Sequence, residues 1–324
     1  MTVDASVVVA THERSALLAR LVAAIEAQEP PPREVVIVDD GSEDGTWMEL
    51  QRLAAISNLR IVPIRFDRNR GPAAARNAGW RAATADRVVF TDDDCVPLPG
   101  WLAALTNALD DHEVVQGRTL PDPAQGGNWG PFSRTMEVLT ETGYYPTCNI
   151  AYRKETLERT AGFDEAYRHP AGEDTDLAWR ALETGARSTF VPGAVVLHDI
   201  RPSNWLVHVR DASRWSGVVL AVHHHPRLRE RFHRRWFWKP SHPPALLALA
   251  GFVGAAWGGP SRRSAIARVA ALALVAPYVR YRMKVLPLAP GRRGLAAIPQ
   301  GLAADWAEIA VLAASSVRYR TLLL

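Results

Sequence analysis

Three successive aspartates, Asp92, Asp93 and Asp94, directly follow the apolar run VVFT at residues 88–91. Carboxylates so close together repel one another, and a nearby cation relieves the repulsion. Carboxylate oxygens are the preferred ligands of hard divalent ions such as Mg²⁺ and Mn²⁺, which keep positions free for water and phosphate oxygens. Alternation along the chain points Asp92 and Asp94 to one side. We therefore predict that this pair binds a metal ion, with a solvated acidic turn as the alternative.

Short β-branched runs alternate with helical patterns before this cluster. Strands are expected at residues 5–10, 34–38, 60–65 and 87–91, and helices at residues 15–28, 46–56 and 72–83. The first helix repeats its apolar residues at helical spacing, and three prolines at 30–32 end it. Such alternation predicts an α/β fold with an open, mostly parallel sheet and helices on both faces.

Polar residues follow all four expected strands. They are THER at residues 11–14, DDGS at 39–42, DRNRG at 67–71 and DDD at 92–94. Ligands bind at the carboxyl ends of the strands in open sheets of this kind. Helix capping explains one small polar residue at such a turn, but it does not require three successive carboxylates. We therefore expect a ligand site at this rim.

Composition limits the classes of function. The 324 residues are 48% hydrophobic, which is typical of a globular protein, and they carry a net charge of +4. Carboxylates dominate before about Arg201 and basic residues after it, so the acidic half argues against a nucleic-acid groove. Two cysteines build neither a disulfide framework nor a four-cysteine zinc site. The first residues lack the pattern of an export signal, so a reducing cytosol is expected.

Four segments in one order resemble the inverting family-2 glycosyltransferases with the GT-A fold: SVVVATHER, VVIVDDGSEDGT, NRGPAAARNAGWRAA and VVFTDDDCVPLPGWL. CNIAYRKETLERTAGFDEAY and GEDTDLAWRALETGA resemble that family's acceptor-side segment and Glu-Asp motif, so the resemblance covers residues 3–200. It implies a nucleotide-diphospho-sugar donor, Mn²⁺ or Mg²⁺ as cofactor, and a carbohydrate or lipid-linked acceptor hydroxyl. Cell-envelope polysaccharide or glycolipid synthesis is the process that such an enzyme would serve.

The resemblance also assigns residues to the donor side of the cleft. Asp39 would contact the base or ribose, and the helix that opens at residues 71–77 would offer free amides to phosphate. Asp92 and Asp94 match the metal motif. The family commonly has Pro, Tyr and Asn where this chain has Ala10, His12 and Glu13, so uridine, guanosine and thymidine donors all stay open. The residues assigned to the nucleotide sugar are Thr11, Glu13, Arg14, Asp39, Asp67, Arg76 and Asp93.

On the acceptor side, Asp174 matches the base position of the Glu-Asp motif. An inverting transfer needs one base to deprotonate the attacking hydroxyl. The place of Asp174 in the first turn of a helix should stabilise its ionised form; the alternative is that the acids of GEDTD only cap this helix. The resemblance also assigns three residues to the acceptor side of the cleft: Glu173, Cys148 and Asn149. Ordinary strand pairing is the alternative for Cys148 and Asn149. His198 is a candidate metal ligand, or a histidine satisfied within a loop.

The chain after residue 205 is basic and rich in His and Trp, and we divide it into a catalytic domain at residues 1–230 and a helical region at 231–324. Three apolar segments, at residues 244–259, 265–278 and 302–317, are shorter than a clean membrane span. Helices that lie in the membrane interface fit this pattern, which places the enzyme on the cytoplasmic face of a membrane. A soluble helical subdomain in the cytosol is the alternative.

Two other functions share parts of this pattern. A catalytically silent nucleotide-sugar-binding scaffold would bind the donor without transfer, and a nucleotidyltransferase of similar fold would use a nucleoside triphosphate. The presence of Asp174 argues against the first, and the Gly-Glu-Asp block argues against the second. A nicotinamide dehydrogenase is disfavoured because no GxGxxG turn follows the first strand.

Overall fold

The computed structural model describes residues 2–257, 262–285 and 293–324. These residues form two compact units, the first made of Met1–Gly126 and Thr135–Ile200 and the second of Gly127–Arg134 and Arg201–Leu324. We expected a domain boundary between residues 230 and 231. Compact units are not the same as independently folding domains, so that boundary stays a prediction. The last residues of the apolar segment 244–259 lie outside the described residues.

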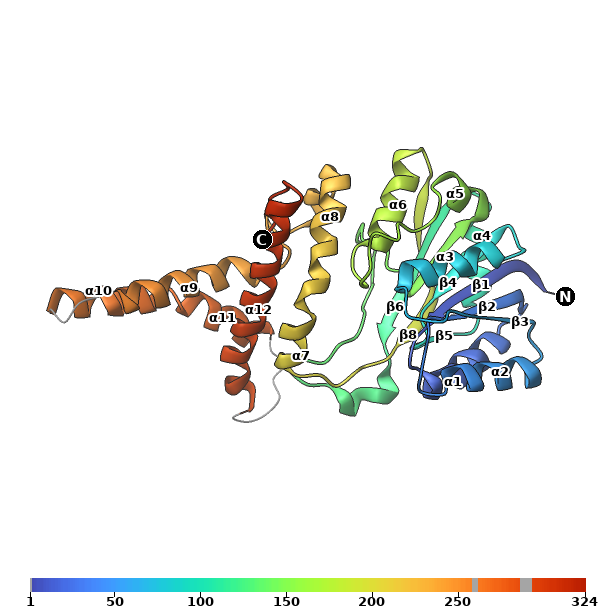
Figure 1. Ribbon diagram of the computed structural model, residues 1–324, viewed down its shortest axis with the longest axis horizontal. Coiled ribbons are helices and arrows are strands. Elements are labelled where there is room, and N and C mark those ends of the chain that lie inside the picture. The colour runs from blue at the N-terminus through green and yellow to red at the C-terminus, as the bar shows by residue number, and fades with distance from the viewer. Residues whose placement is uncertain (1, 258–261, 286–292) are drawn as a thin grey trace. The chain divides into compact units, whose positions relative to one another are not determined.

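The first unit is built on an eight-stranded sheet of order β3-β2-β1-β4-β7-β6-β8-β5 (Figure 1). Strands β3, β2, β1 and β4 are parallel, β7 runs antiparallel to its neighbours β4 and β6, and β6 is parallel to β8. The expected α/β fold with a mostly parallel sheet over its first half is confirmed. The strands are β1 Val3–Thr11, β2 Pro32–Asp39, β3 Ile61–Arg65, β4 Arg87–Thr91, β5 Cys95–Pro97, β6 Val114–Pro121, β7 Asn149–Arg153 and β8 Ser188–His198.

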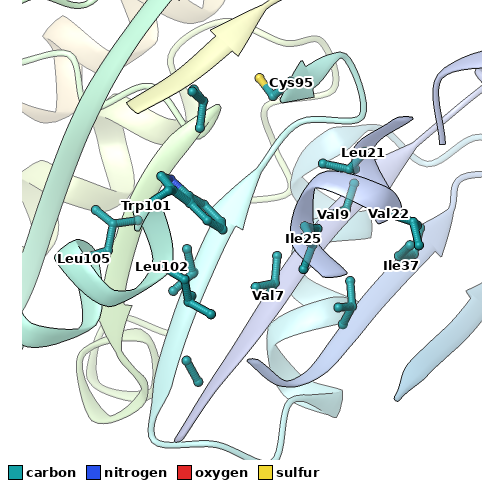
Figure 2. Packing of buried hydrophobic residues seen from close by; sticks show 14 of the residues in the cluster. Val7, Val9, Leu21, Val22, Ile25, Ile37, Cys95, Trp101, Leu102 and Leu105 are labelled. Atoms are coloured by element: carbon teal, nitrogen blue, oxygen red, sulfur yellow. The ribbon is translucent and has the colours of Figure 1, made fainter. Parts of the chain in front are cut away.

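Helices cover both faces of this sheet because the inner strands are apolar on both sides. Val7 and Val9 of β1 pack against α1, α2 and α4, as Figure 2 shows for α1 and α4. The alternate residue Val8 packs against α3, α5 and α6 on the other face. The helices are α1 Ser15–Glu26, α2 Thr46–Ile56, α3 Pro72–Ala82, α4 Trp101–Ala108, α5 Lys154–Arg159 and α6 Glu173–Glu183.

Strand register brings the carboxyl ends of the parallel strands to one rim. Thr11 pairs with Asp39, and Asp39 with Arg65. On the far side of the sheet, the short β5 is antiparallel to β8 and pairs Cys95 with His198. This pairing places the residue before Cys95, Asp94, beside the end of β8, although about a hundred residues separate the two in sequence.

The second unit is helical. Its α-helices are α7 Trp205–Arg210, α8 Ser216–His224, α9 His242–Ala256, α10 Arg262–Ala273, α11 Ala276–Val285 and α12 Arg293–Arg318. Short 3₁₀ helices occupy Asp211–Trp215 and Pro226–Arg231, and another, Pro123–Asn128, begins in the first unit. The apolar segment 265–278 is divided between α10 and α11, because Pro277 lacks an amide hydrogen and fits only the first turn of a helix. Of the helices in the described ranges, α12 has the length and composition to cross a membrane, over Gly294–Arg318.

Candidate active site

The three aspartates after β4 turn toward three different partners. Asp92 accepts a hydrogen bond from Arg76 Nη2 at 2.9 Å, and Asp93 accepts one from Thr11 Oγ1 at 2.7 Å. Asp94 Oδ1 lies 3.5 Å from His198 Nε2. Each carboxylate therefore has a protein partner of its own in this turn.

The pKa of Asp93 is strongly perturbed by its surroundings. Burial and the charge of Asp94 raise its pKa to about 7, against the hydrogen bond from Thr11 and the charge of Arg14. Arg14 Nε lies 3.9 Å from Asp93 Oδ1. Thr11, Arg14 and Asp93, which were expected together on the nucleotide side, do meet in the structure.

Asp94 and His198 form the group best suited to a metal ion. Ligand atoms of Asp94, Cys95 and His198 lie within 4.8 Å of one another, and all three residues are buried. Carboxylate oxygens suit Mn²⁺, and a neutral imidazole is the commonest metal ligand among protein side chains. Burial raises the pKa of the Cys95 thiol well above its usual value, so the neutral sulfur is a poor ligand. The residues present therefore fit a divalent ion held by Asp94 and His198.

Residues that sequence reasoning missed hold the end of β8 in place. Arg20 of α1 bonds to Asp122 and lies 3.5 Å from Asp199, the residue after His198. Gln125 donates to the same Asp199 carboxylate and accepts from the Ile200 amide at 2.8 Å. A basic residue on the outer face of a helix carries no sequence signal for this role, because its partners lie about a hundred residues or more away.

Arg76 links the two carboxylate groups of the site. Its side chain is 9% exposed and donates to Glu173 Oε1 at 3.0 Å as well as to Asp92. Burial opposes its charge, but Asp92 and Glu173 outweigh burial and raise the pKa of Arg76. Loss of one partner from such a buried ion pair destabilises a protein by about 3–5 kcal/mol. Arg76 was expected to bind the nucleotide. In the structure it contacts Asp92 of the aspartate turn and Glu173 of α6 at the same time.

Asp174 lies beside this link, in the first turn of α6. The helix starts after Gly172, whose φ of 97° is in the left-handed region that glycine tolerates. The Asp174 carboxylate accepts from the Thr175 amide at 2.7 Å. Burial and the neighbouring Glu173 nevertheless raise the pKa of Asp174 to about 7. The helix amide of Thr175 lowers the pKa as expected, but burial and Glu173 outweigh it.

Other residues expected on the donor side are linked through Ser42. Glu13 donates its amide to Ser42 Oγ at 2.8 Å, and the Ser42 amide donates to Asp39 Oδ1 at 3.0 Å. Asp67 is exposed on the loop after β3, and no hydrogen bond or ion pair in the described ranges joins it to the others. Asp40, which we had not singled out, accepts from the Arg70 and Gly71 amides at 2.7 and 2.9 Å and so fixes the start of α3.

The expected acceptor-side pair of Cys148 and Asn149 is buried. Asn149 donates to the carbonyls of Arg118 and Ala194 at 2.7 and 2.9 Å and accepts from Trp101 Nε1 at 2.8 Å. These bonds tie β6, β7, β8 and α4 together. The Cys148 thiol lies 3.4 Å from Thr119 Oγ1. Their contact with an acceptor stays a prediction.

Comparison with protein families agrees with this geometry. Residues 6–167, half of the chain, match the model of glycosyl transferase family 2, and residues 87–281 match that of glycosyl transferase family group 2. The chain belongs to glycosyl transferase family 2. The expected family is thereby confirmed.

Relatives of this family-2 protein occur among characterised bacterial proteins. It is 31% identical over 240 residues to the pre-mycofactocin glycosyltransferase of Mycobacterium tuberculosis, a match that covers 68% of this chain and 48% of that protein. It is 32% identical over 217 residues to the succinoglycan biosynthesis protein ExoO of Rhizobium meliloti, covering 61% of each. The chain thus spans about half to three fifths of the length of these relatives.

Solved structures share the fold. The mannosyltransferase PcManGT of Pyrobaculum calidifontis, solved with GDP-Man and Mn²⁺, matches with a TM-score of 0.58 and 22% identity over 99% of this chain and 88% of that one. GalNAc-T7, solved with UDP, GalNAc and Mn²⁺, matches with a TM-score of 0.51 and 17% identity over 61% of this chain and 43% of that one. The expected GT-A type fold is confirmed.

Proposed function

We propose that this protein transfers a sugar from a nucleotide-diphosphate donor to an acceptor hydroxyl with inversion, assisted by a divalent ion. The observation that carries the proposal is the double ion pair of Arg76, which joins Asp92 at the end of β4 to Glu173 beside Asp174. This double ion pair connects the turn that would bind the metal ion to the helix start that carries the candidate base. A relative whose name places it in succinoglycan biosynthesis supports a carbohydrate or lipid-linked acceptor.

The donor side would bind the nucleotide diphosphate. Asp94 and His198, 3.5 Å apart, would hold Mn²⁺ or Mg²⁺, with Asp92 able to join them. When bound, the ion neutralises the charge that develops on the leaving diphosphate. Arg14 is the cation nearest to Asp93 in this turn, and the Ser42 loop would position the nucleoside through Asp39 and Glu13.

The acceptor side would supply the base. Asp174 would take the proton from the acceptor hydroxyl as the oxygen attacks the anomeric carbon and the bond to the diphosphate breaks. A pKa of about 7 suits this step, because a general base works best when its pKa is near the working pH. Glu173, held by Arg76 at 3.0 Å, adds negative charge that keeps this pKa high.

A purified-enzyme assay tests the proposal. Nucleoside diphosphate release from UDP-, GDP- and dTDP-sugars would be measured with an oligosaccharide or polyprenyl-phosphate-sugar acceptor, in Mn²⁺ and after chelation. We expect transfer with one donor class, loss on chelation, recovery with Mn²⁺, and a product of inverted anomeric configuration by NMR. Full activity of the chelated enzyme would contradict the metal step, and a retained configuration would contradict the single-base mechanism.

The same assay separates the two alternatives. Donor binding without transfer to any acceptor would favour a silent scaffold. Formation of a nucleotide sugar from a sugar phosphate and a nucleoside triphosphate would favour a nucleotidyltransferase.

We place the enzyme at the cytoplasmic face of a membrane, with the cytosol as the alternative location. The basic composition of residues 231–304, which lack Asp and Glu, supports attraction to an anionic membrane surface.

A further inference from the structure

Helices α9 and α10 of the second unit expose large apolar side chains to solvent. From Pro243 to Ala256, α9 has no charged residue, so it cannot turn a charged face to water. Soluble domains seldom display such surfaces unless they bind a partner or a membrane. The side chains that are 41% to 70% exposed include Leu247, Leu249, Val253, Ile266, Val269 and Leu272.

Small residues explain why the large ones point outward. Helices α9 and α10 run side by side (Figure 1). Gly251 lies so close to α10 that a Cβ atom there would be 2.4 Å from the Ala271 carbonyl oxygen, and Gly254 faces the Ala271 methyl group. The two helices therefore pack through glycine and alanine, and their leucine, valine and isoleucine side chains stay on the outside.

The polar groups of α12 hold one face of this helix against the rest of the same unit. Its Glu308 is 2% exposed and accepts from Lys239 Nζ at 2.7 and 2.8 Å, and His242 Nε2 lies 3.3 Å away. Asp305 accepts from Tyr278 at 2.7 Å and from Ser241 at 3.1 Å. Because Lys239 already supplies a cation to this group, it is a structural ion-pair network rather than a metal site.

Charge identifies the partner of the exposed face. Between Glu230 and Asp305 the sequence contains no carboxylate. It contains twelve basic residues: Arg231, Arg234, Arg235, Lys239, Arg262, Arg263, Arg268, Arg280, Arg282, Lys284, Arg292 and Arg293. Trp257, 85% exposed, follows the end of α9, and tryptophan is enriched at the membrane interface. A basic, apolar surface of this kind matches anionic headgroups above acyl chains.

We infer that the α9–α10 pair is the element that docks on an anionic lipid bilayer, and that α12 stays inside the protein. Apolar side chains of the pair enter the acyl boundary while neighbouring arginines and lysines meet the phosphates. This inference refines the proposed membrane location and is independent of the transfer chemistry.

Vesicle binding of the full chain tests the inference. Ile266→Ser with Val269→Ser removes two side chains that are 69% and 70% exposed. We expect the partition coefficient onto phosphatidylglycerol-containing vesicles to fall roughly ten- to hundredfold. The matched control is Met48→Ser with Ile56→Ser, at exposed apolar positions of α2, which should bind as the wild type does. High salt and pure phosphatidylcholine vesicles should both weaken wild-type binding.

Fluorescence provides a second measurement. Brominated phosphatidylglycerol should quench wild-type emission more than that of Trp257→Phe, because the indole would reach the acyl region. Equal vesicle binding by the α10 double variant and the wild type would overturn the inference. A fully active wild-type enzyme that binds no vesicles would also overturn the inference. A wild-type dimer that the double variant converts to a monomer would overturn it too, because the exposed face would then be a self-association surface.

Discussion

The substitution Asp174→Asn should lower the activity of the enzyme and raise the stability of its fold above neutral pH. Asparagine has the shape of aspartate but does not accept a proton, so loss of the proposed base should lower kcat by about 10²- to 10⁴-fold. Donor affinity should be retained, because the nucleotide-side residues around Thr11 and Ser42 are untouched.

The stability effect follows from the pKa of Asp174, which burial and Glu173 raise from 3.8 to about 7. A carboxyl group whose pKa is raised on folding binds protons more tightly in the folded state, so its contribution is present at low pH and is lost as pH rises from about 4 to 7. At about 1.4 kcal/mol per pH unit, the ionised form destabilises the fold by up to about 4 kcal/mol. Asp174 is partly exposed, so solvent screening reduces this to about 2 kcal/mol.

Thermal unfolding at two pH values checks this reasoning. At pH 8, Asp174→Asn should unfold at a temperature higher by roughly 4–8 °C than the wild type, and at pH 5 the difference should shrink. Glu158→Gln, at an exposed acid on α5, is the control and should match the wild type in both assays. The wild-type pH profile of kcat/KM should rise through about pH 7. A variant that keeps near-normal turnover, or that is less stable than the wild type at pH 8, would refute the reasoning.

Three further predictions concern the links around the site. Arg76→Met leaves Glu173 and Asp92 without their cation and should lower the free energy of unfolding by about 3 kcal/mol at neutral pH, measured by urea titration. The control is Arg81→Met, at a side chain 51% exposed on the same helix, which should lower the free energy of unfolding by less than about 1 kcal/mol. Equal losses in the two variants would contradict the bridging role of Arg76. Trp101→Phe removes the donor to Asn149 and should destabilise by about 1–3 kcal/mol in the same titration. The Cys148 thiol, 2% exposed, should resist iodoacetamide until denaturant unfolds the protein; mass spectrometry showing rapid native labelling would contradict its burial.

The first half of the sheet was predictable because its signals are local. The strand expected at residues 87–91 coincides with β4, and the helix expected at 46–56 coincides with α2. Glycine, aspartate or serine stands directly next to each end of these elements, so neighbouring sequence is sufficient to place them.

The second half depends on partners distant in sequence. Strand β5 is only three residues long and exists because Cys95–Pro97 pairs with the end of β8. The same pairing brings Asp94 to His198, which a resemblance could suggest but a local pattern could not. The direction of the Asp174 pKa also eluded local reasoning: the helix start is visible in sequence, whereas the burial that overrides it comes from tertiary packing.

The bridge made by Arg76 has a consequence for domain engineering. The guanidinium sits on α3, in the half expected to bind the nucleotide, while one of its two anions belongs to α6, in the half expected to face the acceptor. Chimeras that graft a foreign acceptor module onto this donor module must therefore inherit a compatible acid in the recipient's Glu-Asp motif. Without it, the buried Arg76 would keep only one of its two anions, Asp92, at the seam of the graft.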